Sequence, residues 1–369
     1  MWFYIGTSAD PNNPGAGIYA CQLDEATGAL SKPQLAIHTR RPSFLALSPD
    51  QKFLVACNEI DDMHGKRQGG VSSLAIDAAD VGKLTPVNEQ LSGGMGPCFV
   101  EIDPSGRCVL TANYASGSVA VLPIDPATGK LSPPSAKDQH HGTGPDKSRQ
   151  DGPHAHSMRV APAAAADGAE PGTRFTLACD LGVDKVFVYK LDAARGSLTP
   201  NDPPFVETVP GGGPRHTAFS HDGRFVYVVN EMGNSVSVFG WDATRGVLTP
   251  VQTITTLPEG FHGTTKAAEV AVHPNGKFLY ASNRGFDSIA CFTIDESTGR
   301  LTSGPIVPTG GSFPRHFAVD PTGKWMVVAH QNSNDIVTFR IDQNTGGLTA
   351  TSAKVEAPAP TCVRFLTAR

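Results

Sequence analysis

Short stretches of alternating apolar and polar residues recur along the whole 369-residue chain. Residues 225–229 (FVYVV) and 235–239 (SVSVF) are examples. Side chains at alternate positions of a strand point to opposite faces of the sheet, so this period of two is typical of β-strands. Segments with Gly, Pro and Asp separate the stretches and favour tight turns. The pattern predicts many short strands and no long helix.

One turn phrase repeats seven times and sets the organisation of the chain. It reads Asp-x-x-Thr/Arg-Gly-x-Leu, with one extra residue in the second copy, and begins at Asp24, Asp77, Asp125, Asp192, Asp242, Asp295 and Asp342. These positions span 318 residues in six steps, which gives a mean period of 53. A regular repeat of this length indicates seven structural units.

A second turn phrase lies between the copies of the first, as in SHDGR at 220–224 and HPNGK at 273–277. The two phrases divide each unit into four strands, which we call a, b, c and d. Four antiparallel strands per repeat is the composition of a propeller blade. The sequence therefore predicts an all-β, seven-bladed β-propeller, formed as a single domain by residues 1–369.

The two ends of the chain are predicted to share one blade. The N-terminal segment begins with a b-like strand and lacks strand a, and residues 360–366 (PTCVRFL) match the start of a unit. This C-terminal strand would close the ring. Two polar or Ala-rich insertions, at about 133–152 and 162–173, are expected to be surface loops, with His140 and His141 exposed to solvent.

Composition narrows the function. The 39 Gly and 30 Pro residues fit the many turns, and 39% hydrophobic residues fit a folded chain. With a formal charge of −5, the chain lacks the overall positive charge that is typical of nucleic-acid-binding proteins. The seven Cys form no Cys-x-x-Cys motif and are expected to be reduced core thiols. With no signal-like start and no long apolar run, we expect a cytoplasmic protein without a membrane or nucleic-acid partner.

Ionisable residues gather at one predicted rim of the central channel. Strand a starts where strand b ends, on the face opposite to the repeated turns. Residues at these positions in blades four to seven are His154, His156, Arg215, His216, Glu231, Glu269, Arg284, Arg315 and His316. Isolated charges are costly to bury, so the cluster indicates mutual pairing, a ligand or a wet channel mouth.

Structural explanations of the same residues stay open. Arg215 and Glu231 also fit a purely structural ion pair, and His216 and His316 fit hydrogen-bonded inner-strand histidines. His154 and His156 could place two metal ligands on one strand face, but no third histidine stands at a known zinc spacing. Calcium held by Glu and Asn oxygens is a further alternative. We expect neither a metal nor a cofactor.

Several phrases together resemble a known family. They are QDGPHAH at 150–156, DLGVDKVFVYKLD at 180–192, GPRH at 213–216, VVNE at 228–231, HPNGKFLYASNRG at 273–285 and PRHFAVDPTGK at 314–324. In this order they are similar to the seven-bladed propeller lactonases, a family that includes cycloisomerase-type 6-phosphogluconolactonases and the 3-carboxy-cis,cis-muconate lactonizing enzyme. The resemblance covers essentially the whole chain.

The resemblance implies a metal-free catalytic set of His154, Arg215, Glu231 and Arg284. The neighbouring His156, His216, Glu269, Arg315 and His316 are expected to contact an anionic lactone substrate. The implied reaction is hydrolysis of a sugar lactone such as 6-phospho-D-glucono-1,5-lactone, with either His154 or Glu231 as the base. Lactonization of a carboxymuconate is the nearest alternative. A non-enzymatic binding scaffold is a third, although the focus of ionisable groups on the channel mouth disfavours it.

Overall fold

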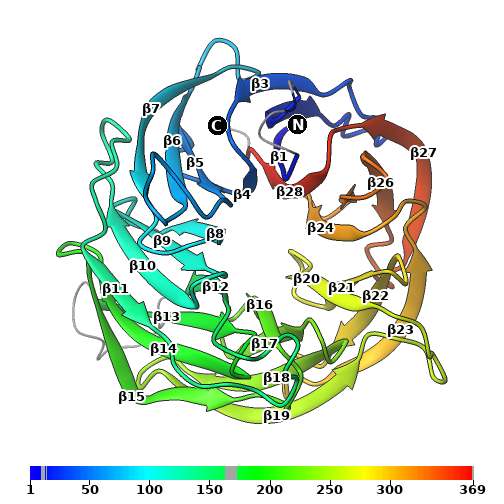
Figure 1. Ribbon diagram of the computed structural model, residues 1–369. Coiled ribbons are helices and arrows are strands. Elements are labelled where there is room, and N and C mark those ends of the chain that lie inside the picture. The colour runs from blue at the N-terminus through cyan, green and yellow to red at the C-terminus, as the bar shows by residue number, and fades with distance from the viewer. Residues whose placement is uncertain (10–12, 14, 163–172, 368–369) are drawn as a thin grey trace.

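The structure is a computed structural model that describes residues 1–9, 13, 15–162 and 173–367. Seven four-stranded antiparallel sheets stand in a ring around a central axis (Figure 1). The predicted seven-bladed β-propeller is therefore confirmed. The strands of blades one to three, from the axis outward, are β28 (Pro360–Phe365), β1 (Trp2–Thr7), β2 (Gly17–Gln22) and β3 (Gln34–His38); β4 (Pro42–Leu47), β5 (Phe53–Asn58), β6 (Gly70–Ile76) and β7 (Leu84–Leu91); and β8 (Pro97–Ile102), β9 (Cys108–Asn113), β10 (Ser118–Pro123) and β11 (Ala136–Gln139).

Blades four to seven follow the same order. Their strands are β12 (Ala155–Val160), β13 (Thr173–Asp180), β14 (Lys185–Asp192) and β15 (Ser197–Glu207); β16 (Pro214–Phe219), β17 (Phe225–Asn230), β18 (Ser235–Asp242) and β19 (Val247–Thr255); β20 (Lys266–Val272), β21 (Phe278–Arg284), β22 (Ser288–Ile294) and β23 (Leu301–Pro308); and β24 (Pro314–Val319), β25 (Trp325–His330), β26 (Asp335–Ile341) and β27 (Leu348–Glu356).

The core lies between neighbouring blades. Strands such as β9 and β25 are buried along their whole length because both faces of the sheet pack against adjacent blades. Outer strands such as β27 alternate between exposed and half-buried residues. The apolar side chains thus bind the blades to one another, and all seven cysteines are buried and unpaired, as expected.

The glycine of the repeated turn phrase has a packing function. Gly299, in the c–d turn of blade six, has a φ of +70° and lies against the Phe225 ring at the start of strand b of blade five. A Cβ atom at Gly299 would come within 2.3 Å of that ring. Gly129 packs on Phe53 in the same way between blades three and two. The phrase therefore sets both the turn and the distance between blades.

The first blade joins the two ends of the chain, as predicted. The innermost strand β28 pairs antiparallel with β1, in a register that places Val363 opposite Ile5. In Figure 1 the red C-terminal strand lies beside the blue N-terminal one at the channel. This pairing gives blade one the inner strand that its own N-terminal segment lacks.

The prediction of a surface loop at 133–152 is wrong in two respects. Residues Ala136–Gln139 form β11, the outer strand of blade three, which pairs with β10. His140, expected in solvent, is buried, whereas His141 is exposed as predicted. An outermost strand needs no apolar face, so the polar sequence AKDQ carries no hydrophobic signal. The second insertion, 162–173, lies almost entirely outside the described residues.

Candidate functional site

The rim residues come from the inner ends of blades four to seven. His154 immediately precedes β12, and Arg215 and His216 lie in β16. Glu231 follows β17, and Arg284 ends β21. Strands a and b of each blade run antiparallel, which brings these starts and ends to one face, opposite to the a–b and c–d turns. The arrangement of strands thus gathers residues from several blades around the channel mouth.

Glu231 is the centre of a buried ion cluster. Its Oε2 lies 3.1 Å from Nε of Arg215 and 2.7 Å from Nη2 of Arg284. Its Oε1 lies 2.8 Å from Nη2 of Arg149. Burial alone would raise the pKa of Glu231, but the charges of Arg284 and Arg215 outweigh it and hold that pKa well below its usual range. Glu231 is therefore ionised and a weak base.

Burial in the same cluster lowers the pKa of two of its arginines. Burial and the charge of Arg284 lower the pKa of Arg215 to about 10. Burial likewise lowers the pKa of Arg284. Three guanidinium groups share one carboxylate, so the cluster carries excess positive charge. Such a place favours an anionic ligand or a transition state that develops negative charge.

Arg149 is the residue that the sequence analysis missed. It lies in the connection between β11 and β12, within the segment predicted to be a surface loop, yet its Nη2 donates to Glu231 and, at 3.0 Å, to Oη of Tyr114. Arg149 immediately precedes the phrase QDGPHAH that carried the family resemblance. That proximity is the signal that could have identified it.

His154 lies at the solvent side of the cluster. Its ring stacks on Tyr114, with ring centroids 4.5 Å apart and an angle of 16° between the planes. Nδ1 lies 2.9 Å from the carbonyl oxygen of Tyr114. A carbonyl can only accept, so Nδ1 carries the proton and Nε2 presents its lone pair. Nε2 is 3.8 Å from the exposed carboxylate of Asp151, and the side chain is 20% exposed.

A buried network fixes the backbone at His154. The Oδ1 atom of Asp180 accepts the His154 N–H at 2.7 Å, and its Oδ2 lies 2.6 Å from Nδ1 of His140. Nε2 of His140 is 2.8 Å from Oη of Tyr189, which donates to Asp138. The histidine expected in solvent is therefore part of the support beneath His154. Its partners lie 40 and 49 residues away, so no local pattern indicated them.

Comparison with known proteins decides the family. The sequence profile described as "Lactonase, 7-bladed beta-propeller" matches residues 2–365. The chain belongs to this lactonase family. It is 35% identical to the 6-phosphogluconolactonase of Bacillus subtilis (strain 168), over 98% of this chain and 97% of the relative. The resemblance inferred from the sequence is thus confirmed.

Solved structures agree. The periplasmic gluconolactonase PpgL of Pseudomonas aeruginosa superimposes with a TM-score of 0.89 at 33% identity, covering 100% of this chain and 99% of that one. A protein from Lactobacillus plantarum gives a TM-score of 0.87 at 31% identity and covers 99% of both chains. The propeller of this lactonase-family chain is therefore shared along its full length.

A second layer of predicted residues lies deeper in the lactonase channel. Oε2 of Glu269 is 2.9 Å from Nδ1 of His216 and 3.3 Å from Nε2 of His316. Burial lowers the pKa of His316 to about 3 and that of His216 well below its usual value, so both rings are neutral. His216 and His316 thus have the environment expected of hydrogen-bonded inner-strand histidines.

Of the remaining two predicted residues, His156 lies near Glu231 and Arg315 lies apart from it. His156 has its Nε2 4.0 Å from Oε2 of Glu231, and burial together with the charge of Arg215 lowers the pKa of His156 well below its usual value. Arg315 does not join Glu231. Its Nη2 lies 3.6 Å from Glu59, and its Nη1 donates to Gln331 at 3.1 Å. It therefore forms a separate pair at the rim.

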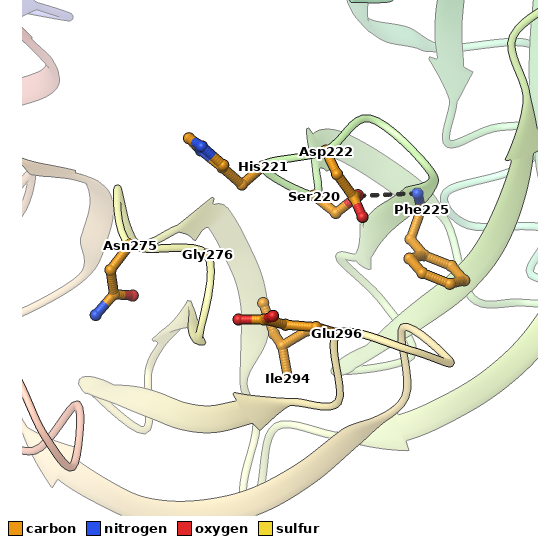
Figure 2. Close-up of a pocket in the computed structure, with 8 residues that line it drawn as sticks. All are labelled: Ser220, His221, Asp222, Phe225, Asn275, Gly276, Ile294 and Glu296. Carbon is orange, nitrogen blue, oxygen red and sulfur yellow. Dashed lines mark hydrogen bonds between the residues drawn. The ribbon is translucent and has the colours of Figure 1, made fainter. Parts of the chain in front are cut away.

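The pocket in Figure 2 lies on the opposite face of the lactonase fold, between turns of blades five and six. Its volume is about 110 Å³. The polar groups there form hydrogen bonds within the turn to which they belong. Oγ of Ser220 accepts the Phe225 N–H at 2.9 Å and donates to Asp222 at 2.7 Å. Neither this pocket's position nor its lining connects it with the arginine cluster.

Within the described ranges, no group of three or more His, Cys, Asp or Glu side chains is arranged to hold a metal ion. A helix with the length and hydropathy of a membrane span is likewise lacking in the part of the chain that the structure describes.

Proposed function

We propose that the protein hydrolyses 6-phospho-D-glucono-1,5-lactone to 6-phosphogluconate with its own side chains and no metal ion. The observation that carries the proposal is His154: its Nε2 has no hydrogen-bond partner among the described residues, and its ring stacks on Tyr114, which bonds Arg149 of the guanidinium cluster. The names of the Bacillus and Pseudomonas relatives, a 6-phosphogluconolactonase and a gluconolactonase, support this choice of substrate. The cytoplasmic location expected from the sequence stays a prediction.

Of the two candidate bases, the structure favours His154. Glu231 is held by three arginines, and its lowered pKa makes it a poor proton acceptor. His154 has one nitrogen occupied by a carbonyl and the other available. A group that activates water needs an accessible lone pair within reach of the substrate, and His154 has one. Glu231 instead holds the arginines in position.

The proposed reaction proceeds in two steps. Nε2 of His154 takes a proton from water while the water oxygen attacks the lactone carbonyl carbon, and the carbonyl oxygen becomes an oxyanion. When this intermediate collapses, the bond between the carbonyl carbon and the ring oxygen breaks. The imidazolium of His154 returns its proton to the ring oxygen, which becomes a hydroxyl group, and the new carboxylic acid releases its proton to solvent.

The arginine cluster would stabilise the oxyanion. Nη2 of Arg215 and Nη1 of Arg284 have no hydrogen-bond partner among the described residues, while the other nitrogens of both groups are engaged. Fixed donors of this kind lower the energy of a developing negative charge without reorganising. Their attachment to Glu231 and to main-chain carbonyls keeps them in place.

The test is hydrolysis of freshly prepared 6-phosphogluconolactone, corrected for its spontaneous rate, by wild type and His154→Gln. We expect the variant to lose about 10²–10⁴-fold in kcat while keeping its circular dichroism spectrum. His221→Gln, an exposed histidine on the opposite face, is the matched control and should keep full activity. A fully active His154→Gln variant would contradict the assignment of the base.

Further substrates separate the alternatives. Unphosphorylated gluconolactone and carboxymuconate are offered in parallel, each with and without a chelator. Turnover of carboxymuconate alone would replace the proposal with lactonization, and no turnover of any substrate would favour a binding scaffold. We expect the chelator to leave the rate unchanged; loss of activity on chelation would overturn the metal-free reaction.

A further inference from the structure

The three arginines around Glu231 are not equivalent. Arg215 is 3% exposed and donates from Nη1 to the carbonyl of Ala268 at 2.6 Å in addition to its bond with Glu231. Arg284 is 6% exposed and donates from Nη2 to the carbonyl of Ala267 at 2.9 Å. Main-chain bonds therefore fix both groups as parts of the channel wall.

Arg149 has a different environment. Its side chain is 27% exposed, and only Nη2 is engaged, with Glu231 and Tyr114. Its Nε and Nη1 atoms have no hydrogen-bond partner among the residues that the structure describes. Two donor nitrogens of this guanidinium group thus remain available at the solvent side of the mouth. Either nitrogen can donate a charge-assisted hydrogen bond to a phosphate oxygen.

The loop around Arg149 is held firmly. Gln150 is buried, and its Nε2 donates at 2.8 Å both to the carbonyl of Leu181 and to Oδ1 of Asp184. Asp146 closes the preceding turn by accepting the N–H and the hydroxyl of Ser148. The backbone at Arg149 is therefore anchored to blade four, and the guanidinium group needs little further ordering to bind an anion.

The surrounding charges favour an anion beside Arg149. Lys266, at the start of β20, has a pKa lowered by burial and by the charge of Arg149, so these two cations face the same region. Glu231 is shared by three arginines, and the carboxylate of Asp151 is exposed beside His154. The solvent side of the mouth thus has more cations than nearby carboxylates can neutralise.

We propose that Arg149 is the specificity residue that binds the phosphate monoester of the substrate and so distinguishes a phosphorylated sugar lactone from an unphosphorylated one. This inference rests on the proposed lactonase function and names the residue that selects its substrate. Tyr114 connects the two parts of the site, since its hydroxyl accepts from Arg149 while its ring stacks on His154. The phosphate would therefore bind beside the base, with the lactone carbonyl directed toward the arginine cluster.

The experiment compares Arg149→Met with Lys147→Met. Lys147 lies in the same loop and is exposed, and among the described residues it donates to the carbonyl of Gly144 alone, so its replacement removes the same charge without touching the cluster. For each variant, kcat/KM is measured for 6-phosphogluconolactone and for unphosphorylated gluconolactone. We expect Arg149→Met to lose about 10- to 100-fold more in kcat/KM on the phosphorylated lactone than on the unphosphorylated one, mainly through KM. Lys147→Met should change neither value more than about 2-fold.

A direct measurement of phosphate binding tests the inference whatever the catalytic result. Calorimetric titration with inorganic phosphate should show binding to wild type and Lys147→Met that is at least about 10-fold weaker in Arg149→Met. Equal losses on both lactones, or phosphate binding that the variant retains or that wild type lacks, would overturn the role of Arg149 while leaving the proposed hydrolysis intact. Failure of wild type to hydrolyse either lactone would instead contradict the proposed function, and the phosphate titration would still decide the role of Arg149.

Discussion

The two faces of the propeller use charged residues in opposite ways. On the face of the a–b and c–d turns, an aspartate serves the turn on which it lies: Oδ1 of Asp295 accepts the N–H groups of Ser297 and Thr298, two and three residues on. At the channel mouth, Glu231 pairs with Arg149, which is 82 residues away in sequence and belongs to another part of the ring. The turn charges are local and independent, whereas the mouth charges depend on one another.

This difference predicts where a substitution is tolerated. A turn aspartate can be lost with the damage confined to one turn, because its partners are backbone groups of that turn that water can also satisfy. Loss of Glu231, the carboxylate that the mouth arginines share, leaves several buried charges uncompensated. The experiments below measure that contrast, beginning with the largest expected effect.

The largest effect is expected for Glu231→Gln. The substitution keeps the shape of the side chain but leaves the buried Arg215 and Arg284 without their counterion. We expect a loss of about 3–5 kcal/mol in the free energy of unfolding, together with at least about 100-fold lower activity. Chemical denaturation and the lactone assay measure the two effects.

The control for this variant is Asp80→Asn, which breaks an exposed pair with Lys83, 2.9 Å long. Because surface ion pairs are weak, we expect its melting temperature to stay within about 1 °C of wild type. If both variants were equally stable, the distinction between the two kinds of charge would be wrong.

A smaller effect on the free energy of unfolding is expected when the pH is lowered. The pKa of His316 is lowered from 6.5 to about 3 by burial, so the folded protein keeps this ring neutral while the unfolded chain binds a proton. Stability is therefore complete above about pH 6.5 and declines as the pH falls toward 3. At pH 5 this one group should cost about 2 kcal/mol. Urea midpoints at pH 7 and pH 5 measure the loss.

The matched variants for this effect are His316→Gln and His221→Gln. The first removes the buried titrating ring and should make stability less dependent on pH, while the second changes an exposed histidine and should not. A wild-type midpoint that does not move between pH 7 and pH 5 would contradict the neutral state of the buried histidine.

A still smaller effect than that of acid is expected for Asp295→Ala, on the turn face. The variant loses the side-chain acceptor for two N–H groups, which remain accessible to water. We expect a decrease of about 1–2 °C in the melting temperature and no change in kcat/KM. Differential scanning fluorimetry and the lactone assay test this. A large loss of activity would show that the two faces are coupled.

The fold was predictable because its determinants are local. A few consecutive residues are enough to predict each part of it: the repeated turn phrase predicts a turn, and the sequences at 225–229 and 360–366 predict strands. β11 was missed because it lacks such a local signal. Its sequence AKDQ forms an outer strand through main-chain bonds to β10, and main-chain pairing leaves no trace in the choice of side chains.

The site was predictable only in part. The positions of Arg215, Glu231 and Arg284 follow from strand starts and ends, and they do meet. Arg149 and His140 lie in an irregular connection whose path depends on buried partners such as Gln150 and Asp180. A periodic pattern cannot describe such a path, so His140 was expected in solvent and Arg149 was not identified.

The pairing of β28 with β1 also determines the order in which the ring can form during synthesis. A chain that leaves the ribosome from its N-terminus can pair β1 with β2 early, but the inner edge of β1 has no partner until Pro360–Phe365 emerges. The first blade begun is thus the last one finished. Until then the ring stays open with an unpaired strand edge, to which another nascent chain can bind. The channel wall can therefore be completed only after the strands of all seven blades have been made.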